Sequence, residues 1–150
     1  LQAPDLTGIE LSELPSHVFG QQLAINRLTQ RELKKVKLAI VGIDAAFAKK
    51  TREAIYPLSW NFQNLKVADL GDVRKASPDF IIPFLRELQS SGIIPILIGA
   101  DADTLRAQYQ SFQETQRQVS VVVVDQKISI SPEPSKAKAY SLNPASDFIT

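Results

Sequence analysis

Aspartates follow the short apolar runs of this chain, and carboxylates grouped in this way can bind a divalent metal ion. The run 93–98 leads through Gly99 to Asp101 and Asp103, and the run 119–124 leads directly to Asp125. Oxygen ligands of this kind suit magnesium and manganese. An aspartate at a strand end also commonly caps the next helix or turn, and we favour that simpler role for the earlier ones, which are Asp44, Asp69 and Asp72.

Ligands of open parallel sheets bind beyond the carboxyl ends of the strands. If the two later runs are neighbouring strands, the residues that follow them meet at one edge of the sheet. The ligand-facing loop predicted from the sequence therefore consists of Gly99, Asp101, Asp103, Asp125 and Lys127.

The order of apolar runs and helical patterns predicts the fold that would position these residues. Strands are predicted at 36–43, 65–70, 93–98 and 119–124, and helical patterns at 21–35, 46–58, 77–91 and 103–115. The second helix is expected to end near Tyr56 because Pro57 follows, and the third to begin with Ser77 as N-cap and Pro78 in the first turn. Alternating strands and helices form βαβ units with helices on both faces. The predicted class is α/β, a three-layer α/β/α sandwich whose mainly parallel sheet has all four runs at its centre.

The chain of 150 residues fits one such domain. Residues 1–35 are predicted to be a lead-in segment with a helix, residues 36–130 the α/β core, and residues 131–150 a loop-like C-terminal segment.

Composition excludes several classes of function. A net charge of +1 argues against nucleic-acid and membrane surfaces as partners. The absence of cysteine excludes thiolate chemistry, and the single histidine, His17, excludes a site with two histidine ligands.

No signal-peptide pattern opens the chain, so we expect a cytoplasmic location. Dinucleotide, P-loop and nucleophile-elbow motifs are absent from the sequence.

Three segments resemble the arginase–agmatinase–formimidoylglutamase (ureohydrolase) family, and formimidoylglutamase-like members are the most similar. They are Val67–Val73, Gly92–Asp103 and Val121–Ser129, which are similar to the family's D-L-G-D, P-[IV]-x-[IL]-G-G-D-H-S and V-x-x-D-A-H-x-D motifs. Thr51–Ile55 also resembles the start of the family helix G-P-x-x-I-R, so the resemblance covers about Leu38 to Ser129. It implies an arginase-like fold with Rossmann-like topology.

The resemblance also implies a reaction, because family members hydrolyse linear amidine carbon–nitrogen bonds with two manganese ions bridged by water. The aspartates of the two metal loops correspond to Asp101 and Asp125. The histidine of the first loop falls on Ala102, and the histidine and second aspartate of the other fall on Lys127 and Ser129. Alanine has no donor atom, and a protonated lysine repels a cation. The family's third ligand loop has no counterpart before Thr150, where a C-terminal half would follow.

Three functions are therefore open. The first, which we favour, is a non-catalytic structural or interaction subunit that has lost its metal site and catalytic residues and needs no cofactor. Such a subunit would form a homo-oligomer or bind another protein. The second is a manganese-dependent hydrolase of linear amidines whose ligands come from elsewhere. The third is a binding domain for a small polar molecule.

Lys127 suggests how the first alternative could be built. Residues two apart on an extended strand end point to the same side, so Lys127 and Asp125 should share one face near Asp101 and Asp103. The hypothesis is that the Lys127 ammonium replaces the metal as counter-ion to these acids. The alternative is that Lys127 points into solvent just beyond the strand.

Overall fold

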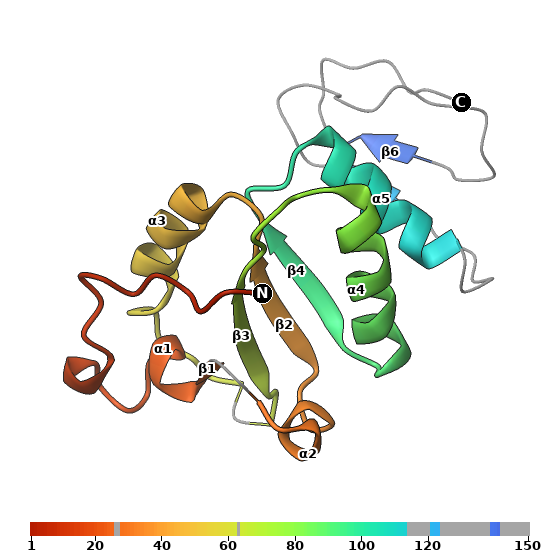
Figure 1. The fold of residues 1–150 in the computed structure, drawn as a ribbon. Coiled ribbons are helices and arrows are strands. Elements are labelled where there is room, and N and C mark those ends of the chain that lie inside the picture. Colours follow the sequence, from red (N-terminus) through yellow and green to blue (C-terminus); the bar gives the residue numbers. More distant parts are fainter. Residues whose placement is uncertain (26–27, 63, 114–120, 124–138, 142–150) are drawn as a thin grey trace.

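The computed structural model of the chain describes residues 1–25, 28–62 and 64–113, together with short strands at 121–123 and 139–141 (Figure 1). A four-stranded parallel sheet organises the described part. Its order is β1 (Ala24–Ile25), β3 (Val67–Asp72), β2 (Leu38–Gly42) and β4 (Ile94–Ile98). The central strand is β2, whose Ile40 lies beside Asp69 of β3 and Ile96 of β4. The predicted α/β class with a parallel sheet is confirmed.

Helices cover both faces of this sheet and complete three layers (Figure 1). On one face lie α1 (Phe19–Gln22) and α3 (Ala45–Ile55), and on the other lie α4 (Pro78–Ser90) and α5 (Ala102–Gln113). The remaining helices are the short 3-10 helix η1 (Leu11–Glu13) and α2 (Gln30–Leu33).

Alternation along the strands divides the core between these layers. In β2, Ile40 packs with Ala48 and Tyr56 on the α3 face, whereas Ala39 and Val41 pack with Leu88 on the α4 face. Successive side chains of a strand point to opposite faces, so one apolar strand can supply both layers. A strand covered on both faces therefore needs a continuous apolar run, which is why β2 was recognisable in the sequence.

Local signals set the helix ends much as predicted. Asp44 caps α3, because its Oδ1 accepts a hydrogen bond of 2.8 Å from the Phe47 backbone N–H. Ser77 has the extended N-cap conformation before Pro78, although its side chain makes no capping bond. Gly92 follows α4 with a φ of +74°, the left-handed conformation that favours glycine after a helix.

Two regions differ from the prediction. Residues 21–35 do not form one helix, because Ala24 and Ile25 pair with the outer edge of β3 instead, and only α2 is helical beyond them. Pairing with a strand has overridden a weak local helical preference. The second region is the run 119–124, expected in the sheet centre. Its described part, β5 (Val121–Val123), pairs in parallel with β6 (Ala139–Ser141) in a separate sheet. β6 lies where the sequence predicted only loop, and β4 forms one edge of the described main sheet.

No helix among the described residues has the length and apolar character needed to cross a membrane.

Gly42→Ala is expected to lower the free energy of unfolding by more than about 2 kcal/mol, measured by urea unfolding. The added methyl group would overlap the Asp72 carboxylate and lie 2.8 Å from Cβ of Ala48. The matched control is Gly92→Ala, where a Cβ has no neighbour within 4 Å and only the backbone conformation resists substitution. That strain costs about 1 kcal/mol. Equal losses in the two variants would contradict the close packing of Asp72 on Gly42.

Candidate functional site

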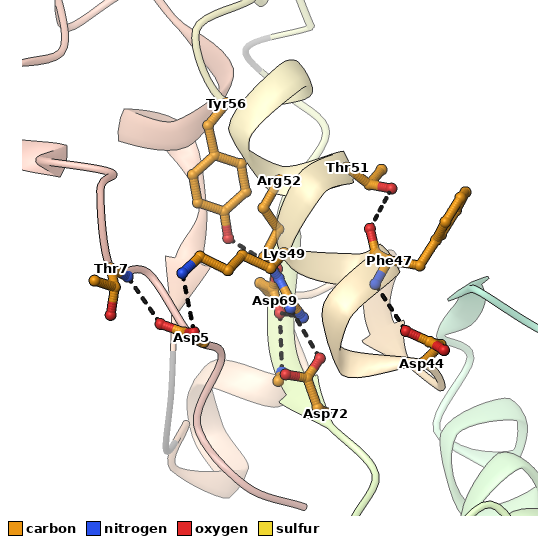
Figure 2. A network of polar contacts seen from close by, with 11 residues as sticks. Asp5, Thr7, Asp44, Phe47, Lys49, Thr51, Arg52, Tyr56, Asp69 and Asp72 are labelled. Atoms are coloured by element: carbon orange, nitrogen blue, oxygen red, sulfur yellow. Dashed lines mark hydrogen bonds and ion pairs between the residues drawn. The ribbon is translucent and has the colours of Figure 1, made fainter.

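A buried network of charged groups lies between α3 and β3, and it is the most concentrated chemistry among the described residues (Figure 2). Arg52 and Tyr56 come from α3 and its C-cap, whereas Asp69 and Asp72 come from β3. The side chains of Arg52, Asp69 and Asp72 are at most 1% exposed. One cation therefore faces two carboxylates without contact with water.

The donors of Arg52 are matched to both acids. Its Nε and Nη2 donate to the two carboxylate oxygens of Asp69 at 2.7 and 3.0 Å, and its Nη1 donates to Asp72 Oδ1 at 2.8 Å. The Tyr56 hydroxyl adds a bond of 2.8 Å to Asp69 Oδ2. The fork of guanidinium donors fits such bidentate pairing, which lysine could not reproduce.

An irregularity of the backbone puts both acids on the α3 side. Residues three apart in a regular strand point to opposite faces, so Asp69 and Asp72 would ordinarily be separated by the sheet. The pairing of β2 with β3 shifts register between Ile40 and Gly42, and Gly71 has a φ of +87°. A shift of one residue reverses the direction of the side chains that follow it. Asp72 thereby joins Asp69 at the guanidinium of Arg52.

The N-terminal segment covers the same end of β3. Gln2 and Asp72 exchange two backbone hydrogen bonds of 2.9 Å, and a Cβ on Gly71 would collide with the Gln2 carbonyl oxygen. Asp5 then forms an ion pair of 3.2 Å with Lys49 of α3 (Figure 2). Hydrogen bonds from the Thr7 side chain and backbone, followed by the Lys49 contact, lower the pKa of Asp5 to about 2.

The protonation states of the network follow from its neighbours. Burial alone would lower the pKa of the Arg52 guanidinium, but the hydrogen bonds and charges of Asp69 and Asp72 outweigh it and hold the pKa above its usual value. Burial raises the pKa of the Tyr56 phenol, and the negative charge of Asp69 raises it further. Arg52 is therefore charged and Tyr56 neutral at physiological pH. Since no member is exposed, the network can bind two secondary-structure elements together but cannot meet a substrate in this state.

The residues predicted to face a ligand are used differently. Asp101 Oδ1 accepts hydrogen bonds from the Thr104 backbone N–H at 2.8 Å and from the Thr104 hydroxyl at 2.7 Å, so Asp101 caps α5. The Thr104 side chain and then its backbone N–H lower the pKa of Asp101. Asp103 is exposed in the first turn of α5, and Gly99 has a φ of +76° beside Asp44. The structure thus brings Gly99 and Asp44 together at the ends of β4 and β2.

The remaining predicted positions cannot be compared with the structure. Asp125, Lys127 and Ser129 lie outside the described residues, and of Ala102 only the backbone is described, as the first residue of α5. The counter-ion hypothesis for Lys127 therefore stays a prediction. Within the described ranges, no three acidic or histidine side chains are grouped so that they could hold a metal ion.

The simpler role favoured for the earlier aspartates is confirmed at Asp44, confirmed in part at Asp69, which caps a turn, and wrong at Asp72. Asp69 does accept a turn-type bond of 2.9 Å from the Gly71 N–H, but both acids primarily bind Arg52. Arg52 and Tyr56 were not recognised from the sequence as members of a site. The only available signal was their spacing with Ala48, because residues 48, 52 and 56 lie four apart and therefore share one helix face, which the structure shows to be buried.

The chain matches no protein-family model, and no curated protein matches its sequence significantly.

Arg52→Met is expected to lower the free energy of unfolding by about 3–5 kcal/mol, because it leaves two buried carboxylates without their cation. Chemical unfolding of the parent, of Arg52→Met and of a control variant at pH 7 measures this loss. Arg74→Met is the control, since Arg74 is exposed and its substitution should change stability by about 0.5 kcal/mol or less. A loss for Arg52→Met as small as that of the control would show that the network contributes little.

Tyr56→Phe tests the network at alkaline pH. In the folded chain the pKa of Tyr56 is raised, so above pH about 10 the unfolded chain loses this proton while the folded chain keeps it. Proton loss from the unfolded chain favours unfolding, and the stability that depends on Tyr56 decreases as pH rises above that value. We expect the free energy of unfolding of the parent to fall more steeply than that of Tyr56→Phe between about pH 9 and pH 11. Parallel curves for the two proteins would contradict the burial of a neutral phenol.

Proposed function

We propose that this chain is an arginase-like α/β unit that has lost its dimanganese site and serves as a non-catalytic structural or interaction subunit. The observation that carries the proposal is the internal use of its carboxylates. In the described part of the chain, aspartates lie at the carboxyl end of a sheet strand or directly before a helix. Each of these aspartates accepts a hydrogen bond from another group of the same chain. Asp44 and Asp101 cap helices, and Asp69 and Asp72 hold Arg52.

The chemistry of a dimanganese hydrolase would need the opposite arrangement. Two metal ions that activate a shared water need several carboxylate and imidazole donors that point into one open site. Asp101 instead turns its Oδ1 back to Thr104, and the position beside it is alanine. A fold can persist after its chemistry is lost, because packing and capping do not depend on the metal.

The resemblance in the three motif segments supports the arginase-like part of the proposal. The D-L-G-D segment is the one that supplies Asp69 and Asp72, and the segment similar to G-P-x-x-I-R supplies Arg52. These two segments build the interior of the unit, whereas Ala102, Lys127 and Ser129 differ from the family at positions aligned with its metal ligands. We infer that the scaffold has been retained and the metal site has not.

Manganese titration of the purified chain tests the proposal. Addition of the chain should not measurably reduce the electron paramagnetic resonance signal of free Mn²⁺. Incubation of the chain with arginine, agmatine or formimidoylglutamate should yield no hydrolysis product. The comparison protein carries Ala102→His, Lys127→His and Ser129→Asp, which rebuild the ligands implied by the resemblance. It is expected to bind Mn²⁺ at least about tenfold more tightly than the parent, since imidazole and carboxylate replace a methyl group, a protonated ammonium and a neutral hydroxyl, which is a weaker ligand than a carboxylate.

Two results would overturn the proposal. Stoichiometric Mn²⁺ binding by the parent chain would show that a metal site exists, and turnover abolished by a chelator would show that it is catalytic. A failure of the rebuilt protein to gain any affinity would contradict the alignment with the family's metal loops.

A further inference from the structure

Exposed basic side chains gather at the amino end of the sheet, opposite the end at which Asp44 and Asp101 lie. They come from α2, from the turn that leads into β2 and from the residue before β3, and they are Arg31, Lys34, Lys35, Lys37 and Lys66. The backbone brings the two strand starts together, because the Lys37 N–H donates to the Lys66 carbonyl oxygen at 2.9 Å. Figure 1 shows α2 at the end of the sheet where β2 and β3 begin. We call these five side chains the basic surface.

The positive charge of the basic surface is not balanced within the described part of the chain. The ion pairs there involve Lys49 and Arg52, and none includes a member of the basic surface. Glu32 is the acid nearest in the sequence, but its carboxylate accepts bonds of 2.7 and 2.8 Å from the hydroxyl and the backbone N–H of Thr29. These two bonds, and to a smaller extent the charge of Lys35, lower the pKa of Glu32. One acid among five cations leaves four positive charges in this place, although the whole chain carries a net charge of +1.

The helix dipole does not account for this concentration of charge. Cations are favoured in the last turn of a long helix, because its aligned peptide dipoles leave partial negative charge there. α2 consists of the single turn Gln30–Leu33, and Lys37 and Lys66 directly precede strands, which have only small dipoles. Crowded like charges repel one another and destabilise the folded chain. A surface of this kind therefore points to a ligand of opposite charge.

An open hollow of about 500 Å³ adjoins the basic surface. It is lined by Asn61, Phe62, Asn64 and Leu65. The chain passes directly from this lining to Lys66. The Phe62 ring is 63% exposed and packs edge-on against the Trp60 ring, with 5.0 Å between the centroids. An aromatic ring held in this way beside amide groups can receive an apolar side chain and bond the backbone that carries it.

We propose that the basic surface and the adjoining hollow bind an acidic segment of another protein, whose apolar side chain enters the hollow beside Phe62. Complementary charges favour the encounter and orient the partner, and the apolar contact adds affinity that salt does not screen. A nucleic acid fits less well, because nucleic-acid-binding domains are usually strongly basic as a whole and this chain carries +1.

This inference names the kind of partner for the interaction role proposed above, and it rests on that role only in this respect. Its tests use no metal and measure no hydrolysis. Manganese binding by the chain would overturn the proposed function and leave the basic surface unaffected, so the two proposals can fail separately.

Fluorescence anisotropy with a defined peptide tests the contribution of charge. The probe is a fluorescein-labelled peptide of glutamates with one leucine at its centre, and the control peptide has glutamines in place of the glutamates. We expect the acidic peptide to bind the parent chain in about 20 mM salt and at least about tenfold more weakly in about 200 mM salt, since salt screens exposed charges. Absence of binding in low salt at about 1 mM peptide, or equal binding of the two peptides, overturns the proposal.

Two double variants of the chain test the location of the site. Lys34→Gln with Lys35→Gln is expected to weaken binding of the acidic peptide by at least about fivefold in low salt. The matched control is Arg74→Gln with Lys75→Gln, which removes the same charge from an exposed pair that follows β3 at the opposite end of the sheet. It should weaken binding by less than about twofold. Equal losses would show that the peptide responds only to net charge, and the basic surface would not be its site.

The hollow is tested by substitution of its aromatic ring. Phe62→Ser should weaken binding of the leucine-containing peptide by about fivefold and leave an acidic peptide with serine in place of the leucine unaffected. Phe47→Ser is the control, because Phe47 is 58% exposed on α3 and should affect neither peptide. A Phe62→Ser variant that binds the leucine-containing peptide as well as the parent does contradicts the apolar contact.

The class of partner is tested with competing polyanions at the same salt concentration. A single-stranded RNA and vesicles containing phosphatidylserine should each bind the parent chain more weakly than the leucine-containing acidic peptide, because neither has a side chain for the hollow. Tighter binding of either one would assign the basic surface to that class of ligand and overturn the proposal.

Discussion

The ion pair between Arg52 and the two aspartates of β3 constrains much of the rest of the structure. A guanidinium removed from water needs acceptors for its donors, and here Asp69 and Asp72 supply them. To bring the second acid to the same side, the β2–β3 ladder shifts register and Gly71 adopts a left-handed backbone conformation. To make room for it, position 42 must lack a side chain. Residues distant in the sequence are thus constrained by one buried charge.

The network also explains why an acid-rich edge of the sheet need not be a reaction centre. Carboxylates at strand ends are the usual material for metal sites, but hydrogen bonds within the chain fix the direction of their oxygens, and a buried carboxylate paired with a guanidinium has its charge already balanced. Asp69 accepts bonds from Arg52, Tyr56 and the Gly71 N–H, and Asp101 accepts two from Thr104. Position and residue type are therefore weaker evidence for chemistry than the direction in which the oxygens point.

Features of the fold that depend on neighbouring residues were predictable from the sequence, and those that depend on distant contacts were not. Helix α4 lies within one residue of its prediction at both ends because Ser77-Pro78 and Gly92 are local signals. The strand β1 was missed because its two residues are ordered by the edge of β3 and have no pattern of their own. Arg52 was overlooked because an arginine in a helix is usually solvated, and only its burial beside β3 changes that expectation. Likewise, the orientation of Asp72 could not be read from strand alternation, since the register shift reverses it.

The two edges of the described sheet are protected to different degrees, and the difference has a physical consequence. At the β3 edge, β1 supplies a short partner strand and Gln2 closes the carboxyl end through paired backbone bonds. At the β4 edge the described chain supplies no strand, and protection comes only from Pro95, which lacks the N–H that a long ladder would need. A proline at this place opposes the addition of a strand, because its ring occupies the position from which an N–H would donate to the added strand. Proline on an edge strand is one of the means by which proteins avoid the extended strand pairing that leads to aggregation. The described sheet therefore has one edge closed by its own chain and one edge at which the described chain places a proline that opposes strand addition.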